Sequence, residues 1–101
     1  MGFFNNLTVS DLDVSFVKEY LRIDSSYIED DDLLSLCIES SKNYIKNYLK
    51  TQDLDYFNFE TDVIIACLSL TQHFYISKIT NSDAFIDKTL VKSLLDKYIQ
   101  Y

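Results

Sequence analysis

The sequence of 101 residues contains one glycine and no proline. Tight turns between strands usually recruit both residues, because glycine tolerates positive φ angles and proline presets the φ of a turn. A β-sandwich or barrel with many hairpins is therefore disfavoured. The chain has 48% hydrophobic and 25% charged residues, a balance typical of a folded domain. We expect a single all-α domain over residues 1–101, built as a small bundle of about four helices.

Apolar residues recur at helical spacing in four segments. The spacing predicts helices over residues 14–23, from 29–32 to about 49, over about 60–79 and over 87–98. Asp13 is the expected N-cap of the first helix, because its carboxylate can accept hydrogen bonds from free N–H groups. Residues 51–59 show no period and are predicted to form a loop that packs its own side chains. Residues 1–12 and 97–101 are expected to be flexible arms, the latter a flexible C-terminal tail.

The segment over residues 60–79 is apolar on most of its faces. A helix that is hydrophobic all round needs more than one neighbour to cover it, so we place it at the centre of the bundle. Two explanations of its apolar surface stay open: the core covers all of it, or another subunit covers part of it. Its uncharged run, residues 63–77, is shorter than the roughly 20 apolar residues of a membrane-spanning helix, so no membrane contact is expected.

The chain is acidic: 9 Lys and Arg residues against 16 Asp and Glu residues give a net charge of −7. Affinity for nucleic acids and anionic membranes comes largely from basic residues, so this balance argues against a phosphate-binding surface. Residues 29–32 form a run of four carboxylates at the predicted start of the second helix. Such a run stabilises the free N–H groups and the dipole of the helix, and a functional acidic surface is the alternative. The run lacks the glycine and glutamate of a calcium loop, so no metal site is expected.

Candidate catalytic groups are few. His73, the single histidine, lies among apolar residues, where a core or interface role is a simpler interpretation than a general base. Cys37 and Cys67 are too few and too far apart for a disulfide framework or a zinc site, and we interpret them as reduced core thiols. We therefore expect no enzyme activity and no cofactor.

Basic residues form a row near the end of the predicted second helix, where the helix dipole favours cations. Lys42, Lys46 and Lys50 stand at i, i+4 and i+8 and so share one face. In a head-to-tail ring this row would face the acidic run 29–32 of the neighbouring subunit.

Several segments, in order along the chain, resemble the head-tail connector family of long-tailed bacteriophages, whose members are also described as head-completion adaptors or DNA-packaging connectors. The segments are residues 18–24 (KEYLRID), 31–34 (DDLL), 38–45 (IESSKNYI), Asp62, Val63, Ala66, Leu68, Leu70, 73–75 (HFY) and 90–95 (LVKSLL). Together they span about residues 13–98. The resemblance implies a structural virion protein at the head-tail interface, made in the bacterial host cytoplasm.

By the same resemblance, the protein is expected to form a ring of about a dozen copies beneath the portal. Its expected partners are the portal protein, the stopper or tail-completion protein and further copies of itself, and DNA passes through the channel without specific binding. An alternative function of a different class stays open: a small acidic helical protein that binds one host protein by imitating the charge of nucleic acid.

The resemblance, taken with the charges and aromatics of the chain, suggests three groups of site residues. The acidic channel surface would comprise Glu29, Asp30, Asp31, Asp32, Asp53 and Asp55. The subunit interface would comprise Tyr44, Lys46, Tyr48, Lys50 and Phe74. The portal-docking tail would comprise Tyr98, Ile99 and Tyr101.

Overall fold

The computed structural model describes residues 7–80 and 88–99, and within these ranges its secondary structure is entirely helical. The α-helices are α1 (Val14–Tyr20), α2 (Asp31–Leu49), α3 (Thr61–Ile79) and α4 (Lys88–Leu95). Three short 3-10 helices accompany them: η1 (Val9–Asp11), η2 (Leu54–Phe57) and η3 (Asp96–Tyr98). The predicted all-α class and the number of α-helices are confirmed over the described part of the chain.

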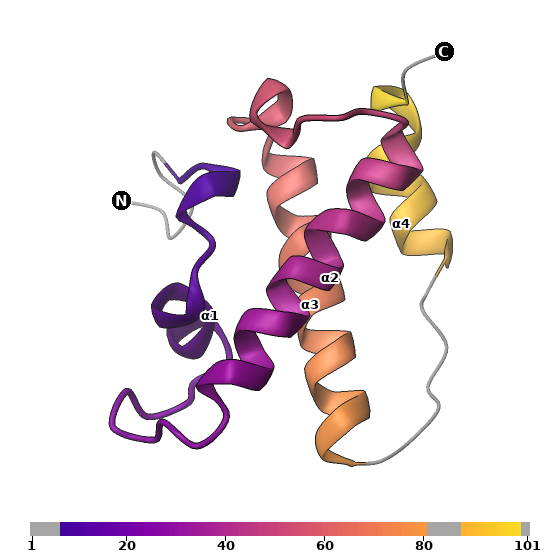
Figure 1. Ribbon diagram of the computed structural model, residues 1–101. Helices are drawn as coiled ribbons and strands as arrows, with labels where there is room; N and C mark the ends of the chain where they lie inside the picture. The colour runs from indigo at the N-terminus through magenta and orange to yellow at the C-terminus, as the bar shows by residue number, and fades with distance from the viewer. Residues whose placement is uncertain (1–6, 81–87, 100–101) are drawn as a thin grey trace.

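The centre of the fold is the antiparallel pair of α2 and α3, which share the most extensive contact between elements (Figure 1). Asp30, just before α2, contacts Tyr75 of α3, and Ser41 of α2 contacts Thr71 of α3. The contact between Ser41 and Thr71 is a buried hydroxyl pair at 2.9 Å. Each hydroxyl is also within hydrogen-bond distance of a carbonyl oxygen of its own helix, Ser41 of that of Cys37 and Thr71 of that of Cys67. Both hydroxyls therefore have partners inside the core.

The helix α3 is central, as its all-round apolar character predicts. It packs against α2, α4 and η1, and buried residues line most of its length. Only near its C-terminal end are large aliphatic side chains exposed, at Ile76 and Ile79. By length and composition alone the stretch Thr61–Thr80 could also cross a membrane, although its uncharged run is shorter. Because α3 packs against three elements, its apolar composition is explained by its place in the core.

The helix ends follow local chemistry. The Asp13 carboxylate accepts a 2.9 Å hydrogen bond from the Phe16 N–H, which confirms the predicted cap of α1. This helix ends at Tyr20 rather than at residue 23, because Arg22 adopts a left-handed φ of 61° and turns the chain toward α2. The C-cap of α2, Lys50, is also left-handed, with a φ of 58°.

The predicted loop over residues 51–59 is more ordered than its sequence indicates. It contains η2, whose Leu54 and Phe57 are buried in the common core rather than against the loop itself. Asn58 fastens it to the N-terminal segment, because its carbonyl oxygen accepts from the Val9 N–H and its side chain from the Ser10 N–H, both at 2.9 Å. The prediction of a loop without regular structure is therefore wrong over Leu54–Phe57, whose buried side chains pack in the common core.

The described parts of both expected arms contact the core. Val9 and Leu12 are buried in the core. At the other end, α4 is followed by η3, whose Tyr98 ring lies edge-on to Phe57 at 5.8 Å between centroids. Residues 1–6, 81–87 and 100–101, and with them the predicted start of the fourth helix at Asp87, lie outside the described residues.

Candidate interaction surfaces

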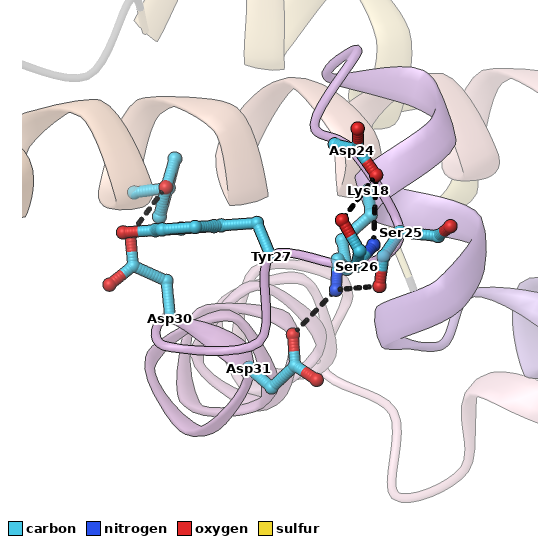
Figure 2. Close-up of polar contacts among 8 residues, drawn as sticks. Lys18, Asp24, Ser25, Ser26, Tyr27, Asp30 and Asp31 are labelled. Atoms are coloured by element: carbon cyan, nitrogen blue, oxygen red, sulfur yellow. Dashed lines mark hydrogen bonds and ion pairs between the residues drawn. The ribbon is translucent and has the colours of Figure 1, made fainter.

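Of the four carboxylates at the start of α2, two are partly buried and make contacts within the chain, and two are exposed. Asp30 stands at the N-cap position, yet its side chain makes no cap hydrogen bond and instead accepts from the Tyr75 hydroxyl at 2.7 Å. Asp31 forms a 2.9 Å ion pair with Lys18. Figure 2 shows these two carboxylates pointing to different sides of the helix start. Glu29 and Asp32 are exposed and carry the acidic character of this end.

Lys18 is a site residue that our sequence reasoning missed. It is only 5% exposed, and its ammonium donates to the Ser25 carbonyl at 3.1 Å as well as to Asp31 (Figure 2). Lys18 stands four residues after Val14 and three before Leu21, both packed against the core, and this shared helix face is the sequence signal that could have revealed it. The ammonium fixes the turn between α1 and α2 against the start of α2.

The pKa of Tyr75 reflects its contact with Asp30. The hydrogen bond to that carboxylate, together with burial, raises the pKa of the Tyr75 hydroxyl to about 12. Ionisation of the phenol would place two negative charges side by side, so the neutral form is favoured.

The second acidic group lies at the other end of α2. Asp53 accepts from the Asp55 N–H at 2.9 Å and so caps η2, and both carboxylates are exposed. They line a groove of about 250 Å³ together with Lys42 and Lys46. Two lysines of the basic row therefore lie beside carboxylates of their own chain. A contact with a neighbouring subunit would come in addition to these.

Two of the predicted interface residues already make contacts within the chain. The rings of Tyr44 and Tyr48 are stacked at 6.4 Å between centroids. The Tyr48 hydroxyl donates a short hydrogen bond to Asp96, which joins the end of α2 to η3. Of the predicted set only Lys50 is exposed, and the others are half-buried: Tyr44, Lys46, Tyr48 and Phe74.

The C-terminal segment is held over the start of α3. The Tyr98 hydroxyl lies 3.1 Å from a Glu60 carboxylate oxygen and 3.2 Å from one of Asp62, and Lys97 pairs with Asp62 at 2.5 Å. The hydrogen bond from Lys97 lowers the pKa of the Asp62 carboxyl. Ile99 is half-buried, and Tyr101 lies outside the described residues.

The thiols are buried, as predicted for core cysteines. Burial raises the pKa of Cys67 to about 11 and also raises that of Cys37, whereas a thiol nucleophile needs a lowered pKa. His73 is half-exposed beside Phe74 rather than enclosed in the core. Within residues 7–80 and 88–99, no three His, Cys, Asp or Glu side chains are grouped to hold a metal ion.

Comparison with known proteins adds a decisive observation. The family model of the phage gp6-like head-tail connector protein matches residues 11–100, nearly the whole chain. The chain belongs to this family. No curated protein and no solved structure matches it significantly.

The head-tail connector family is structural, so this chain is a virion component with a connector role. The segments that carry the resemblance lie in α1 and the turn after it, in α2, in α3 and in α4.

Proposed function

We propose that the chain assembles into a closed ring beneath the portal, extends the DNA channel and joins the head to the stopper and tail. The observation that carries this proposal is the family match over residues 11–100, supported by the all-helical fold. A ring of about a dozen subunits would form by one head-to-tail contact repeated by rotation. The protein would be made in the host cytoplasm and would act without catalysis, cofactor or membrane.

An acidic channel would let DNA pass because like charges repel, and the net charge of −7 supports such a lining. Glu29 and Asp32 are its best candidates at one end of α2, and Asp53 and Asp55 at the other. Asp53 and Asp55 lie beside the second half of α2, in the groove that they share with Lys42 and Lys46, and so are separated along the helix from Glu29 and Asp32. Both can line one channel only if α2 runs nearly parallel to the channel axis. Asp30 and Asp31 would chiefly position this surface through their contacts within the chain.

If α2 instead lies close to the plane of the ring, the subunit contact brings the basic end of α2 against the acidic start of α2 in the next copy. Glu29 and Asp32 then belong to this contact rather than to the channel lining. Lys46 and Lys50 would face Glu29 and Asp32 across the contact. The half-buried rings of Tyr44, Tyr48 and Phe74 would add apolar area beside these charges.

Electron microscopy of the purified chain at high concentration, alone and mixed with the portal protein of the same phage, tests the proposal. Closed rings with a central hole in either sample are expected. Monomers in both samples, at a concentration where the chain is folded by circular dichroism, would contradict it.

The same charge favours a second candidate, a monomeric acidic protein that binds a basic host protein. It predicts competition with DNA for that protein and no portal binding. A competition titration against labelled DNA separates the two functions, because a ring-forming connector would leave such a complex intact.

A further inference from the structure

Two surfaces of the chain expose large apolar side chains in pairs. The aromatic pair consists of Tyr56 and Phe59, which are 81% and 78% exposed, the largest values among the large hydrophobic residues that the structure describes. The isoleucine pair consists of Ile76 and Ile79 near the end of α3, which are 43% and 54% exposed. Exposed apolar surface is typical of interaction sites, because removing it from water is favourable.

Each pair projects from one face of its segment. Over residues 55–60 the chain makes successive turns of three residues, because the Asn58 and Glu60 N–H groups each donate to the carbonyl three residues before. In such turns the side chains of Tyr56 and Phe59, at i and i+3, share a face. The isoleucines are also three residues apart and share a face of α3. Each pair can therefore make one contact as a unit.

The charges beside the two pairs are opposite in sign. The exposed carboxylates Asp55 and Glu60 flank the aromatic pair, and residues 51–60 contain no Lys or Arg. The exposed Lys78 stands between the two isoleucines, and residues 71–80 contain no Asp or Glu. An aromatic surface with an acidic rim thus has its complement, an aliphatic surface with a basic neighbour, on the same chain.

The two pairs lie at opposite ends of α3. Phe59 stands two residues before the first residue of this helix, and Ile79 is its last. Its 19 residues span about 27 Å, and Figure 1 shows η2 beside one end and the C-terminal end of α3 at the far end of the molecule. The pairs cannot meet within one chain, but they can meet between two copies. Such a contact joins unlike surfaces, and repeating it by rotation closes a ring.

The other exposed apolar side chains in the described part of the chain match the aromatic pair less well. Leu90 of α4 offers one aliphatic side chain rather than two, and the nearby Lys92 already pairs with Asp96 at 3.5 Å. Three more lie around the start of α2 beside exposed carboxylates at positions 29, 32 and 39, where contact would oppose carboxylates to carboxylates: Tyr27, Ile28 and Leu36. The isoleucine pair is therefore the matching surface.

The antiparallel arrangement of α2 and α3 relates the two pairs to the charges of α2. The hydrogen bond between Asp30 and Tyr75 holds the start of α2 against the end of α3 that carries the isoleucine pair. At the other end, Asp55 lines one groove with Lys46 of α2. The end-to-end contact of the proposed function, with α2 close to the plane of the ring, thus joins the two ends that carry the pairs. This agreement between charges and apolar surfaces selects a second copy as the occupant.

We propose that Tyr56 and Phe59 of one copy pack on Ile76 and Ile79 of the next copy, with Lys78 facing the carboxylates beside the aromatic pair. The inference rests on the proposed function, since it describes a contact within the ring assigned there. It adds the apolar centre of the contact, to which α2 contributes only charges.

The test compares ring formation of the unmodified chain with that of two variants, Tyr56→Ser/Phe59→Ser and Ile76→Ser/Ile79→Ser. Electron microscopy follows the rings, with the chain alone and with the portal ring of the same phage. Each variant is expected to need at least about a tenfold higher concentration to form rings, as the loss of central apolar residues of an interface implies. Far-UV circular dichroism and thermal melting verify that each variant is folded.

Mixing the two variants tests the pairing itself. Each variant keeps the surface that the other lacks, so one intact contact can form between them, and both outer ends of the product carry substitutions. Sedimentation velocity of the equimolar mixture should therefore show dimers and no rings. A mixture that stays monomeric, in a buffer where the unmodified chain forms rings, would overturn the pairing.

The charged part of the contact has its own test. Lys78→Glu should weaken ring formation, because it opposes the carboxylates of the next copy. The double variant Asp55→Lys/Lys78→Glu should restore most of it by exchanging the two charges. Equal assembly of Lys78→Glu and the unmodified chain would contradict the assigned role of Lys78.

The matched control is Leu90→Ser, which removes an aliphatic side chain exposed to 42%, close to the value of Ile76, and it should form rings normally. A loss in this control alone would move the contact to α4 and overturn the inference. Normal rings from both serine double variants would overturn it as well and leave the proposed function intact. Normal rings of Tyr56→Ser/Phe59→Ser that no longer bind the portal would assign the aromatic pair to the portal instead. Monomers of the unmodified chain, alone and with the portal, would contradict the proposed function and the inference together.

Discussion

The hydroxyl of Tyr75 donates a 2.7 Å hydrogen bond to Oδ2 of Asp30, a residue 45 positions away in the sequence. Tyr75 is 8% exposed, and its charged acceptor makes the bond stronger than one between neutral groups. The contact ties the C-terminal half of α3 to the start of α2. It also explains why Asp30 stands at the N-cap without capping: its carboxylate is committed to another helix.

Replacing Tyr75 by Phe should lower the free energy of unfolding by about 1–2 kcal/mol, because the ring stays while the hydrogen bond is lost. Urea denaturation followed by circular dichroism measures the change. Tyr56→Phe serves as the control for removal of a hydroxyl from an exposed tyrosine. An unchanged midpoint in the Tyr75→Phe variant would show that the bond contributes nothing to stability.

The contribution of this bond should also depend on pH. The pKa of Tyr75 is raised from its usual value of 10.0 to about 12, so folding favours the neutral phenol. The stabilisation is complete below pH 10 and is lost as the pH rises through about 12. The difference in unfolding free energy between the unmodified chain and the Tyr75→Phe variant should therefore shrink in this window. A difference that stays constant up to the alkaline limit of the folded state would contradict the assignment.

The ion pair between Lys18 and Asp31 should respond unequally to removal of each partner. Asp31→Asn leaves the ammonium of Lys18 buried without its counter-charge and should cost about 3 kcal/mol. Lys18→Met leaves Asp31, whose side chain is 38% exposed, free to bind water and should cost clearly less. Urea denaturation of both variants measures the two losses of unfolding free energy. Equal losses would show that the burial of Lys18 does not affect stability.

Much of the framework follows from local sequence rules. The bounds of α2 were predictable because its apolar pattern repeats over 19 residues, and those of α3 because a mainly apolar segment continues over the same length. The central position of α3 followed from its apolar faces. In contrast, η2 spans only Leu54–Phe57, too short for a period to stand out, and its order depends on Asn58 meeting Val9 across the fold.

The candidate sites were less predictable than the framework. The sequence correctly showed where carboxylates cluster, but not that Asp30 and Asp31 face Tyr75 and Lys18, since these partners depend on how α1 and α3 pack on α2. The groove that brings Lys46 beside Asp53 and Asp55 likewise exists only once η2 folds back along α2. Such contacts are long-range and leave no signal in local spacing.

Reversing two charges of the basic row, Lys46→Glu/Lys50→Glu, should prevent ring formation if these residues face Glu29 and Asp32 of the next copy. Carboxylates would then oppose carboxylates across the contact. Sedimentation velocity measures the loss of assembly, and melting temperature reports any strain caused by the new repulsion from Asp53 and Asp55.

The control for this reversal is Arg22→Glu/Lys92→Glu, which changes the net charge equally at exposed positions elsewhere. A second arm adds Glu29→Lys/Asp32→Lys to the reversed chain and should restore the ring by exchanging the charges. Assembly that is unaffected by the reversal would remove Lys46 and Lys50 from the interface.

Truncation after Lys97, which removes residues 98–101, should abolish portal binding if the C-terminal segment docks there. The structure shows that Tyr98 is already held by Phe57, Glu60 and Asp62, so docking exchanges contacts within the chain for contacts with the partner. Tyr98→Phe separates the two contributions, because it keeps the ring on Phe57 and removes only the hydroxyl. We expect this variant to bind the portal at least as well as the unmodified chain, since less holds the segment in place. Calorimetric titration of both variants against the portal ring measures this, and undiminished binding by the truncated chain would show that the tail is dispensable for docking.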